Sequence, residues 1–354
     1  MQGENARTAR RAGANLCVTR APWPGGVPYT CLQPLIRLGR EADEEELVRL
    51  IVTGGAGFIG STLVDMLCAD GHEVTVIDDL RRGSRENLHP TARLIEMGVE
   101  EPGIAAVIHE VAPDAIFHLA AQIDVRSSVA DPLADAQTNV MGTINLLNAT
   151  CSAKVPKLVF ASSGGAIYGD TEIVPTPETH SLLPASPYGA AKGSGELYGS
   201  AYSSMYGLAF TALRYANVYG PRQDPHGEAG VVAIFAQRML ERKSVVINGD
   251  GLQTRDYVYV EDVARANVAA LTSAPGSYNI GTGVATSVRD IARGIAHATG
   301  YDAEPAFGPA RPGEQRRSVL DISLARAALG WSPSIDLETG IALTCDWFAA
   351  RART

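Results

Sequence analysis

The sequence predicts an α/β fold, a Rossmann-like doubly wound parallel sheet with a smaller C-terminal substrate-binding lobe. Three observations predict it. A glycine-rich turn near residue 54 joins a short apolar run to a segment with helical periodicity, and strand-like and helix-like segments then alternate as far as about residue 220. The chain has 354 residues, more than the roughly 100 to 200 of a common domain, which predicts the second lobe.

Residues 1–45 show no apolar period. They mix Arg, Gly and Pro and close on the acidic run EADEEE, which predicts a disordered N-terminal extension. The arginines Arg7, Arg10, Arg11 and Arg20 leave an amphipathic targeting segment as the less favoured alternative, because no clear apolar stripe accompanies them.

Residues 46–220 are predicted to form the first domain, which begins with a β-α-β unit. The β-branched run LVRLIVTGG begins at Leu47, FIGSTLVDMLCADG carries apolar residues at helical spacing, and HEVTVIDD is apolar at alternate positions. Further strands are expected in DAIFHLAA and KLVFASS, with a helical stretch from Pro132 to Ser152 between them. This alternation predicts helices on both faces of a parallel sheet.

Residues 221–354 are expected to form mainly the smaller lobe. The pattern loosens there into Pro- and Gly-rich loops, with short elements such as SVVING and DYVYVEDVARANVAAL. We expect the lobe to close over the carboxyl edge of the sheet, with some of its segments returning to the first domain.

The composition argues against several classes of partner. A formal net charge of −9 leaves no broad basic face for nucleic acid, and no apolar run approaches the roughly 18 residues of a membrane span. The five cysteines lie far apart, without a C-x-x-C pair or a histidine at metal spacing, which predicts reduced thiols, no metal site and a cytoplasmic location. They are Cys17, Cys31, Cys68, Cys151 and Cys345.

The glycine turn predicts a dinucleotide site. TGGAGFIG spaces Gly54, Gly57 and Gly60 between a strand and a helix, where bare backbone N–H groups can approach a pyrophosphate. Asp78 follows Gly60 by eighteen residues, at the end of the second strand. A carboxylate at that place accepts hydrogen bonds from the hydroxyls of the adenosine ribose.

The charges around this acid predict which dinucleotide is bound. Carboxylates at Asp78 and Asp79 would repel a 2′-phosphate, which favours NAD over NADP. Arg81 and Arg82 follow directly and argue for the phosphate. We expect NAD.

A tyrosine and a lysine have the spacing of a catalytic pair. SPYGAAK sets Tyr188 and Lys192 four residues apart, so on a helix both side chains leave the same face. A phenol with its usual pKa near ~10 is a poor base at neutral pH, but an adjacent ammonium and a positive nicotinamide ring favour the phenolate. The pair therefore predicts a tyrosine acid and base, with a lysine that also holds the nicotinamide ribose.

Seven motifs together resemble one enzyme family. TGGAGFIG, FHLAAQIDV, TNVMGT, SSGGAIYG, SPYGAAK, RYANVYGPRQ and TRDYVYVEDVA are similar to motifs of the extended short-chain dehydrogenase/reductases that act on nucleotide sugars, and most similar to bacterial-type UDP-glucose 4-epimerases. The resemblance runs from about Leu47 to the C-terminus. It implies an NAD domain, a sugar-nucleotide lobe and usually a homodimer.

The resemblance also implies site residues. For the cofactor these are Gly54, Gly57, Phe58, Ile59, Gly60, Asp78, Asp79, Leu119, Ala120, Ala121, Asn139, Tyr188, Lys192 and Tyr215. For the UDP-sugar substrate they are Gln122, Ser163, Tyr188, Asn217, Arg255, Arg311, Glu314 and Ser318. Among these, Asn217 and Arg255 match positions that hold the diphosphate, and Arg311 with Glu314 matches a phosphate-and-ribose clamp.

The positions before Tyr168 predict the reaction. Where the resembling 4,6-dehydratases and decarboxylases carry acids, this chain has Gly164, Gly165 and Ala166. Without a carboxyl group there, elimination lacks its general acid and base, so a 4-epimerase acting on UDP-hexoses through a transient 4-keto sugar is favoured. A 4,6-dehydratase, a reductase and a non-catalytic NAD-sensing protein remain the alternatives.

The chain departs from the family pattern at several places. The usual active-site Ser or Thr falls on Gly164, and Ser163 is expected to replace it as the third catalytic residue. An aromatic near the uracil falls on Asn248, and an adenine-side aspartate falls on Gly98. Ser318 stands where a bulky tyrosine excludes an N-acetyl group, which predicts that the N-acetylated UDP-sugars are also accepted. The alternatives are that Arg316 and Arg317 fold over this space or favour the carboxylate of a uronic acid.

Overall fold

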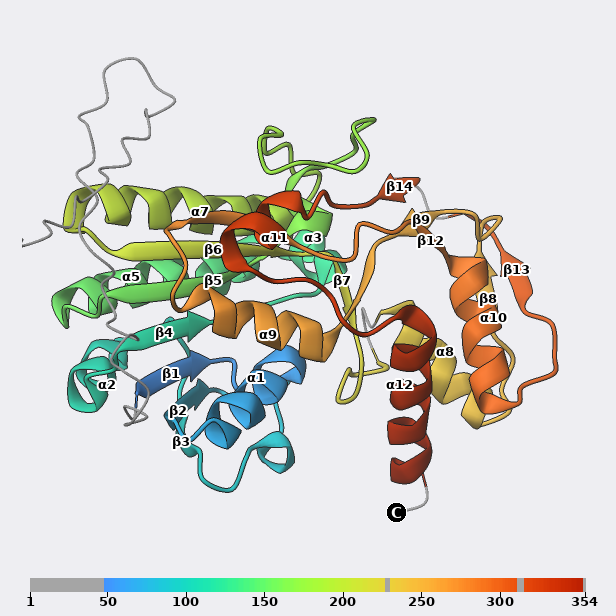
Figure 1. The fold of residues 1–354 in the computed structure, drawn as a ribbon, viewed down its shortest axis with the longest axis horizontal. Helices are drawn as coiled ribbons and strands as arrows, with labels where there is room; N and C mark the ends of the chain where they lie inside the picture. Colours follow the sequence, from blue (N-terminus) through green and yellow to red (C-terminus); the bar gives the residue numbers. More distant parts are fainter. Residues whose placement is uncertain (1–47, 227–229, 311–314, 353–354) are drawn as a thin grey trace, which may run out of the picture. The chain divides into compact units, whose positions relative to one another are not determined.

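A seven-stranded parallel sheet organises the computed structural model, which describes residues 48–226, 230–310 and 315–352. The strand order is β11-β6-β5-β4-β1-β2-β3 (Figure 1). The doubly wound α/β fold predicted from the sequence is confirmed. The strands are β1 (Arg49–Thr53), β2 (Glu73–Asp78), β3 (Arg93–Glu96), β4 (Ala115–His118), β5 (Lys157–Ser163), β6 (Ala209–Tyr215) and β11 (Gly276–Ile280).

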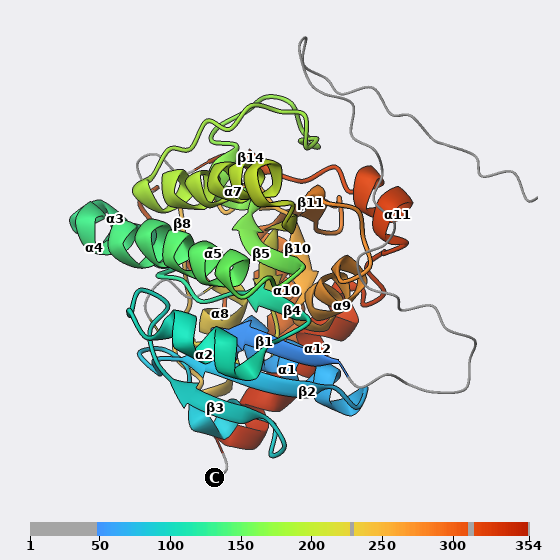
Figure 2. The ribbon, with the colours of Figure 1, turned by 90° about the vertical axis from the view of Figure 1, so that its left-hand side faces the viewer.

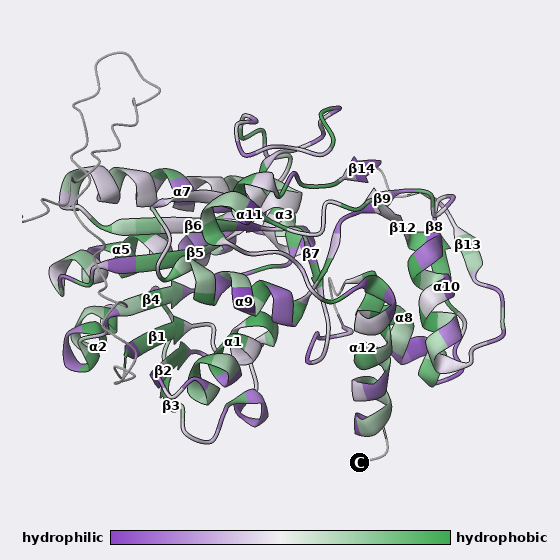
Figure 3. Ribbon diagram, in the orientation of Figure 1, coloured by the Kyte–Doolittle hydropathy of each residue, from purple (hydrophilic) through white to green (hydrophobic). Residues whose placement is uncertain are grey.

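Both faces of the sheet are covered by apolar packing. Alternate residues of a strand point to opposite faces, so Leu50 and Val52 of β1 join one buried cluster and Ile51 joins another. The hydrophobic colour of the central strands in Figure 3 follows from this double burial. Figure 2 shows α2, α5 and α7 on one face and α1, α9 and α11 on the other. These helices are α1 (Phe58–Ala69), α2 (Ile104–Val111), α5 (Gly142–Ser152), α7 (Pro187–Tyr206), α9 (Val260–Ala270) and α11 (Ser323–Leu329).

The helical stretch predicted from Pro132 to Ser152 is one continuous helical segment of mixed type. It begins as α4 (Pro132–Ala136), passes through the π-helical turn η2 (Gln137–Met141) and continues as α5. The side chain of Asp131 caps its start by accepting a hydrogen bond from the N–H of Ala134. Two short helices, α3 (Val125–Ala130) and α6 (Gly164–Ile167), and the 3₁₀ turn η1 (Arg85–Asn87) lie in loops of the first domain.

The segments after residue 220 build a second apolar core and also return to the main sheet. Strand β11 extends the sheet beside β6, and α9 and α11 pack on the first core. Helices α8, α10 and α12 surround the second core. The remaining elements are β7 (Asn217–Tyr219), α8 (Val231–Leu240), β8 (Val246–Asn248), β9 (Thr254–Arg255), β10 (Tyr257–Tyr259), β12 (Thr286–Ser287), α10 (Val288–Thr299), β13 (Ala306–Gly308), β14 (Arg317–Ser318) and α12 (Leu337–Arg351).

The predicted extension at residues 1–45 lies outside the described residues, and the division at residue 220 stays a prediction. All described residues belong to one compact unit, Ile36–Thr354. Within the part of the chain that the structure describes, no helix is both long and apolar enough to cross a bilayer.

Candidate active site

The glycine turn brings backbone close to backbone at the start of α1. Gly54 has a φ of +71°, and a Cβ on it would lie 2.6 Å from the backbone nitrogen of Ala120. A Cβ on Gly60 would lie 2.1 Å from the carbonyl oxygen of Gly54. Gly57 precedes α1, whose first N–H groups have no side-chain cap. Free N–H groups at a helix start favour an anion, and Phe58, Ile59 and Gly60 form that first turn.

Asp78 ends β2 with its carboxylate held toward the turn. Its Oδ2 accepts the N–H of Ala56 at 2.9 Å and its Oδ1 accepts the N–H of Leu80 at 2.9 Å. Burial raises the pKa of Asp78, while the hydrogen bonds from Leu80 and Ala56 act in the opposite direction. Each oxygen of an ionised carboxylate keeps a further lone pair, so both can still accept a hydroxyl.

The loop after β4 lies against the glycine turn and is fixed by Asn139. Asn139 exchanges two hydrogen bonds of 2.8 Å with the backbone of Gln122, and Ala120 donates to the Oγ1 of Thr53 at 3.3 Å. The side-chain nitrogen of Gln122 donates to Asp135 at 2.9 Å. Asn139 thus fixes the loop at the residue that follows the predicted cofactor residues Leu119, Ala120 and Ala121. The side chain of Gln122, a predicted substrate residue, bonds to the Asp124 carbonyl and to Asp135.

The predicted catalytic pair lies at the start of α7. Ser186 caps this helix and Pro187 is its first residue, so Tyr188 and Lys192 share a face one turn apart. The Nζ of Lys192 donates to the carbonyl of Ala161 on β5 at 2.8 Å and lies 5.0 Å from the ring centre of Phe160.

Burial dominates the protonation of both groups. It raises the pKa of Tyr188 to about 12, and a hydrogen bond with the Ser163 hydroxyl lowers it while the charge of Asp135 raises it. Burial lowers the pKa of Lys192 to about 8, against the charge of Asp135. In the protein by itself, the phenol pKa is therefore raised, and not lowered as the sequence predicted for a tyrosine beside a lysine.

The serine that the sequence assigned to the pair lies beside it. Ser163 ends β5 and precedes α6, and its hydroxyl interacts with Tyr188. Ser162 instead donates at 2.5 Å to Glu196, away from the phenol. Of the two serines, the geometry favours Ser163 as the hydroxyl that accompanies the tyrosine.

The three small residues before Tyr168 have different surroundings. A Cβ on Gly164 would lie 2.6 Å from Cδ1 of Leu320, so a larger residue there would displace the Leu320 side chain. A Cβ on Gly165 would meet only the Oδ1 of Asn217, at 4.0 Å. Gly164 is thus a packing residue, and Gly165 borders open space beside a predicted substrate residue.

The predicted sugar-nucleotide residues come from the short strands of the second lobe. Asn217 begins β7, and Arg255 of β9 lies opposite Ser318 of β14 in a parallel pair. The Nη1 of Arg255 donates to the carbonyl of Thr254 at 2.9 Å. Arg311 and Glu314 lie outside the described residues.

Tyr215, predicted to bind the cofactor, is buried at the end of β6. Its hydroxyl donates to Oδ1 of Asn267 on α9 at 3.0 Å, and burial raises its pKa. Its ring, not its hydroxyl, is therefore the part available to a neighbour at the sheet edge. In the described ranges no group of three or more His, Cys, Asp or Glu side chains has the arrangement of a metal site.

Comparison with known proteins agrees with this arrangement. A model of the NAD dependent epimerase/dehydratase family matches residues 50–281. The chain belongs to this family. It is 48% identical over 313 residues to a UDP-glucose 4-epimerase of Mycolicibacterium smegmatis, with 86% of this chain and 100% of the relative covered. A putative UDP-glucose 4-epimerase of Methanocaldococcus jannaschii is 45% identical, with 86% and 100% covered.

Solved structures of related enzymes have the same fold. A UDP-glucose 4-epimerase of Thermotoga maritima with UDP-glucose has a TM-score of 0.85 at 47% identity, with 86% of this chain and 99% of that chain covered. The Thermus thermophilus enzyme in complex with NAD has a TM-score of 0.81 at 46% identity, covering 85% and 98%. A dTDP-glucose 4,6-dehydratase of Streptomyces venezuelae has 0.80 at 31% identity, covering 86% and 98%. The fold is thus shared by different reactions, and the site must decide between them.

The residues of this NAD-dependent enzyme fit its cofactor. Arg81 and Arg82 are the two arginines that argue for the 2′-phosphate of NADP. Arg81 bonds to Asp79 and Glu100, and the side chain of Arg82 lies 3.7 Å from Asp124. Both guanidinium groups therefore lie near acids, as expected for a site that takes an unphosphorylated ribose.

The missing adenine-side aspartate is replaced in space by another carboxylate. A Cβ on Gly98 would lie 2.8 Å from Oε2 of Glu100. This oxygen is buried and has no hydrogen-bond partner among the described residues. A buried acceptor without a donor is costly, so the end of β3 also fits a group that donates a hydrogen bond.

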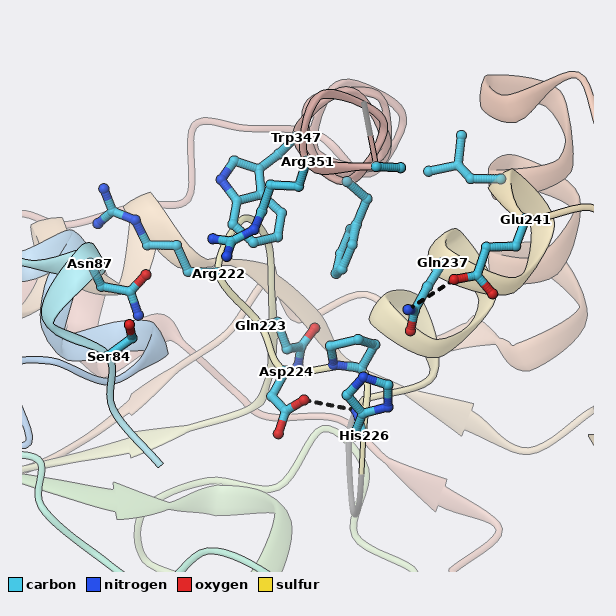
Figure 4. Close-up of a pocket in the computed structure, with 14 residues that line it drawn as sticks. Ser84, Asn87, Arg222, Gln223, Asp224, His226, Gln237, Glu241, Trp347 and Arg351 are labelled. Atoms are coloured by element: carbon cyan, nitrogen blue, oxygen red, sulfur yellow. Dashed lines mark hydrogen bonds between the residues drawn. The ribbon is translucent and has the colours of Figure 1, made fainter. Parts of the chain in front are cut away.

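A cavity lies away from the catalytic pair. It has a volume of about 450 Å³ and is bordered by η1, the segment around Arg222, α8 and α12 (Figure 4). Figure 4 shows charges of both signs around it, with the rings of Trp347 and His226. None of the predicted site residues lines it, and we assign it no part in the reaction.

Proposed function

We propose that this enzyme interconverts UDP-glucose and UDP-galactose by inverting C4 through a transient 4-keto sugar. The observation that carries the proposal is the combination of a Tyr188–Lys192 pair with the uncharged Gly164–Ala166 segment. Bound NAD supplies the chemistry of accepting hydride from C4 and returning it. Its identity as the cofactor follows from the family, while the residues named for it remain proposals.

Tyr188 is the proposed base and acid. Its phenolate accepts the proton of the O4 hydroxyl as C4 is oxidised, and the phenol returns that proton when C4 is reduced. Because burial raises the pKa of Tyr188 to about 12, the phenolate needs nearby positive charge. The nicotinamide ring and the ammonium of Lys192 are the two candidates, and the Ser163 hydroxyl adds a hydrogen bond.

The uncharged segment favours epimerisation over elimination. Removal of water across C5 and C6 needs a positioned acid and base, each worth about 10²- to 10⁴-fold. Gly164, Gly165 and Ala166 supply neither, and the absence of a side chain or close contact at Gly165 supports a site in which the keto sugar turns over. Reduction or a purely NAD-binding role stays the weaker alternative, because binding alone does not require the pair.

A mass-resolved assay tests the proposal. The enzyme is incubated with UDP-glucose, and products are separated and weighed. We expect UDP-galactose of unchanged mass and no net accumulation of NADH. Loss of water would indicate a dehydratase, gain of hydrogen a reductase, stoichiometric NADH a dehydrogenase, and no turnover a binding protein.

We further propose a homodimer formed through α4, η2 and α7. These helices are in contact and carry apolar side chains on the surface, with Leu133 at 82% and Leu197 at 67% exposure. Met141 and Met205 are exposed on the same helices, at 52% and 64%. A second copy would bury these side chains through the same patch on each subunit.

A cytoplasmic location is also proposed. Of the described cysteines, Cys68, Cys151 and Cys345 are free thiols, as expected in a reducing compartment.

A further inference from the structure

A buried ion pair lies directly behind the proposed catalytic helix. Glu196 is one turn beyond Lys192 on α7, and Arg214 lies on β6. The Nη2 of Arg214 lies 2.6 Å from Oε2 of Glu196, and its Nε donates to both carboxylate oxygens at 3.0 and 3.1 Å. Only 8% of the Arg214 side chain and 6% of the Glu196 side chain are exposed.

The ion pair continues a row of contacts between α7 and β5. Lys192 donates to the carbonyl of Ala161, and the next strand residue, Ser162, donates to Oε1 of Glu196 at 2.5 Å. The residue after that, Ser163, interacts with Tyr188. Three consecutive strand residues thus contact three helix residues spaced four apart, which fixes the helix in both rotation and translation along the strand.

The same arginine reaches the small-residue segment. Its Nη1 donates to the hydroxyl of Tyr168 at 2.8 Å, and that hydroxyl donates to Oδ1 of Asn279 at 2.7 Å. Tyr168 directly follows α6, which contains Gly164 and Gly165. One charged group therefore connects the helix that carries Tyr188 with the segment that faces the sugar.

We propose that Glu196 and Arg214 are positioning residues, which hold Tyr188 and Lys192 in register with Ser163 and the Gly164–Ala166 segment. A contribution to folding stability does not by itself explain this ion pair, because replacing both members of a buried ion pair by apolar residues is often neutral or stabilising. Proton and hydride transfer, in contrast, depend on placement to within about 1 Å. The proposal rests on the roles proposed above for Tyr188 and Lys192.

The test replaces both charges together, as Glu196→Met with Arg214→Met, so that no charge is left alone. Tm, NAD retained per subunit, KM and kcat with UDP-glucose are measured. We expect a folded protein that keeps its NAD, with kcat at least about tenfold lower because a displacement near 1 Å costs up to about 100-fold. KM should stay within about twofold, since the lobe that holds the sugar nucleotide is unchanged.

Lys157→Met is the matched control. Lys157 is a buried cation at the other end of β5, where its Nζ donates at 2.9 Å to Thr211 and to the carbonyl of Ser273. Its removal is expected to leave kcat unchanged. An equal fall of kcat in this control would overturn the proposal, because it would show a general effect of altering the core.

The remaining outcomes are decisive as well. A folded double variant with the kcat of the parent shows that the ion pair does not position the site. If the double variant does not fold, Ser162→Ala removes only the bond between β5 and Glu196 and leaves the bond from Ser277 of β11. A kcat unchanged in that variant equally rejects the proposal. Tyr188→Phe in the same assay distinguishes a failure of the proposed function from a failure of the positioning proposal. Full turnover in Tyr188→Phe would reject the proposed base, whatever the ion pair does.

Discussion

At the scale of single residues, Lys192 connects pH to the proposed reaction. Its ammonium is one of the two charges proposed to favour the Tyr188 phenolate, and burial lowers its pKa to about 8. Below that pH the lysine is protonated and supports the phenolate, and above it the charge is lost. We therefore expect turnover to fall as pH rises through about 8, although a free lysine would stay charged to about 10.

Lys192→Ala tests this assignment. Without the ammonium, kcat should fall by about 10² or more, and the alkaline limb near the lysine pKa should disappear from the pH profile. The profile is measured as kcat against pH at saturating UDP-glucose, with Tm followed in parallel. An alkaline limb that persists unchanged in the variant would assign it to another group.

Tyr188→Phe is the most direct prediction at this scale. The substitution removes only the hydroxyl that exchanges a proton with O4, so turnover should fall by about 10² to 10⁴ while Tm and bound NAD stay unchanged. Bound NAD is measured by its absorbance after denaturation. Turnover close to that of the parent would remove Tyr188 from the mechanism.

Substrate breadth is predicted at Ser318. Its small side chain lies beside Arg255 in the β14–β9 pair, and neighbouring Arg316 is directed to Asp250 by two hydrogen bonds of 2.8 and 2.7 Å. Space for an acetamide is thus not closed by Arg316, so UDP-N-acetylglucosamine should be epimerised alongside UDP-glucose. Ser318→Tyr should lower kcat/KM for the acetylated sugar at least about tenfold more than for glucose.

A tyrosine one residue earlier provides the control. Arg317 is exposed and its side chain leaves the opposite side of the strand, so Arg317→Tyr should affect the two sugars equally. Equal losses in Ser318→Tyr, or no acetylated activity in the parent, would contradict the gatekeeper interpretation.

At the scale of elements, Gly195 lets α7 approach the sheet closely, whereas Gly193 on the same helix does not face it. A Cβ on Gly195 would lie 2.5 Å from the ring of Phe160, the ring that also lies beneath Lys192, while a Cβ on Gly193 would meet its nearest neighbour at 3.6 Å. Gly195→Ala should lower the free energy of unfolding by about 1–3 kcal/mol through overpacking. Gly193→Ala should raise it by up to about 1 kcal/mol through helix propensity.

Denaturant unfolding and kcat measure both effects. The shift of Phe160 should also lower kcat in Gly195→Ala, whereas Gly193→Ala should keep the parental kcat. Equal changes in the two variants would mean that the spacing between α7 and β5 does not depend on this contact.

The same helix shows what local sequence could and could not predict. The spacing of Tyr188 and Lys192 and the glycine turn are local, and the sequence predicted both. Strand β11 pairs with β6 across more than fifty residues, and Glu196 finds Arg214 only after packing, so neither follows from a local pattern. Edge strand β3 was not predicted either, because its half-exposed RLIE lacks an apolar period.

At the scale of the whole molecule, the proposed dimer uses the outer side of the helices whose inner side holds the site. Leu197 is exposed on α7, five residues beyond Lys192, and in a symmetric dimer it faces the partner copy. A glutamate there would place two like charges in an apolar interface, which is strongly unfavourable.

Leu197→Glu should therefore convert a dimer into a monomer, as measured by light scattering coupled to size-exclusion chromatography. Leu324→Glu is the matched control, because Leu324 is 42% exposed on α11, on the other face of the sheet. We expect the parent and the control to be dimers, and a parent that runs as a monomer at micromolar concentration would contradict the proposal. The turnover of each variant is measured on the same fractions. If monomeric Leu197→Glu keeps its NAD but loses kcat, the partner copy supports α7 from outside as β5 does from inside.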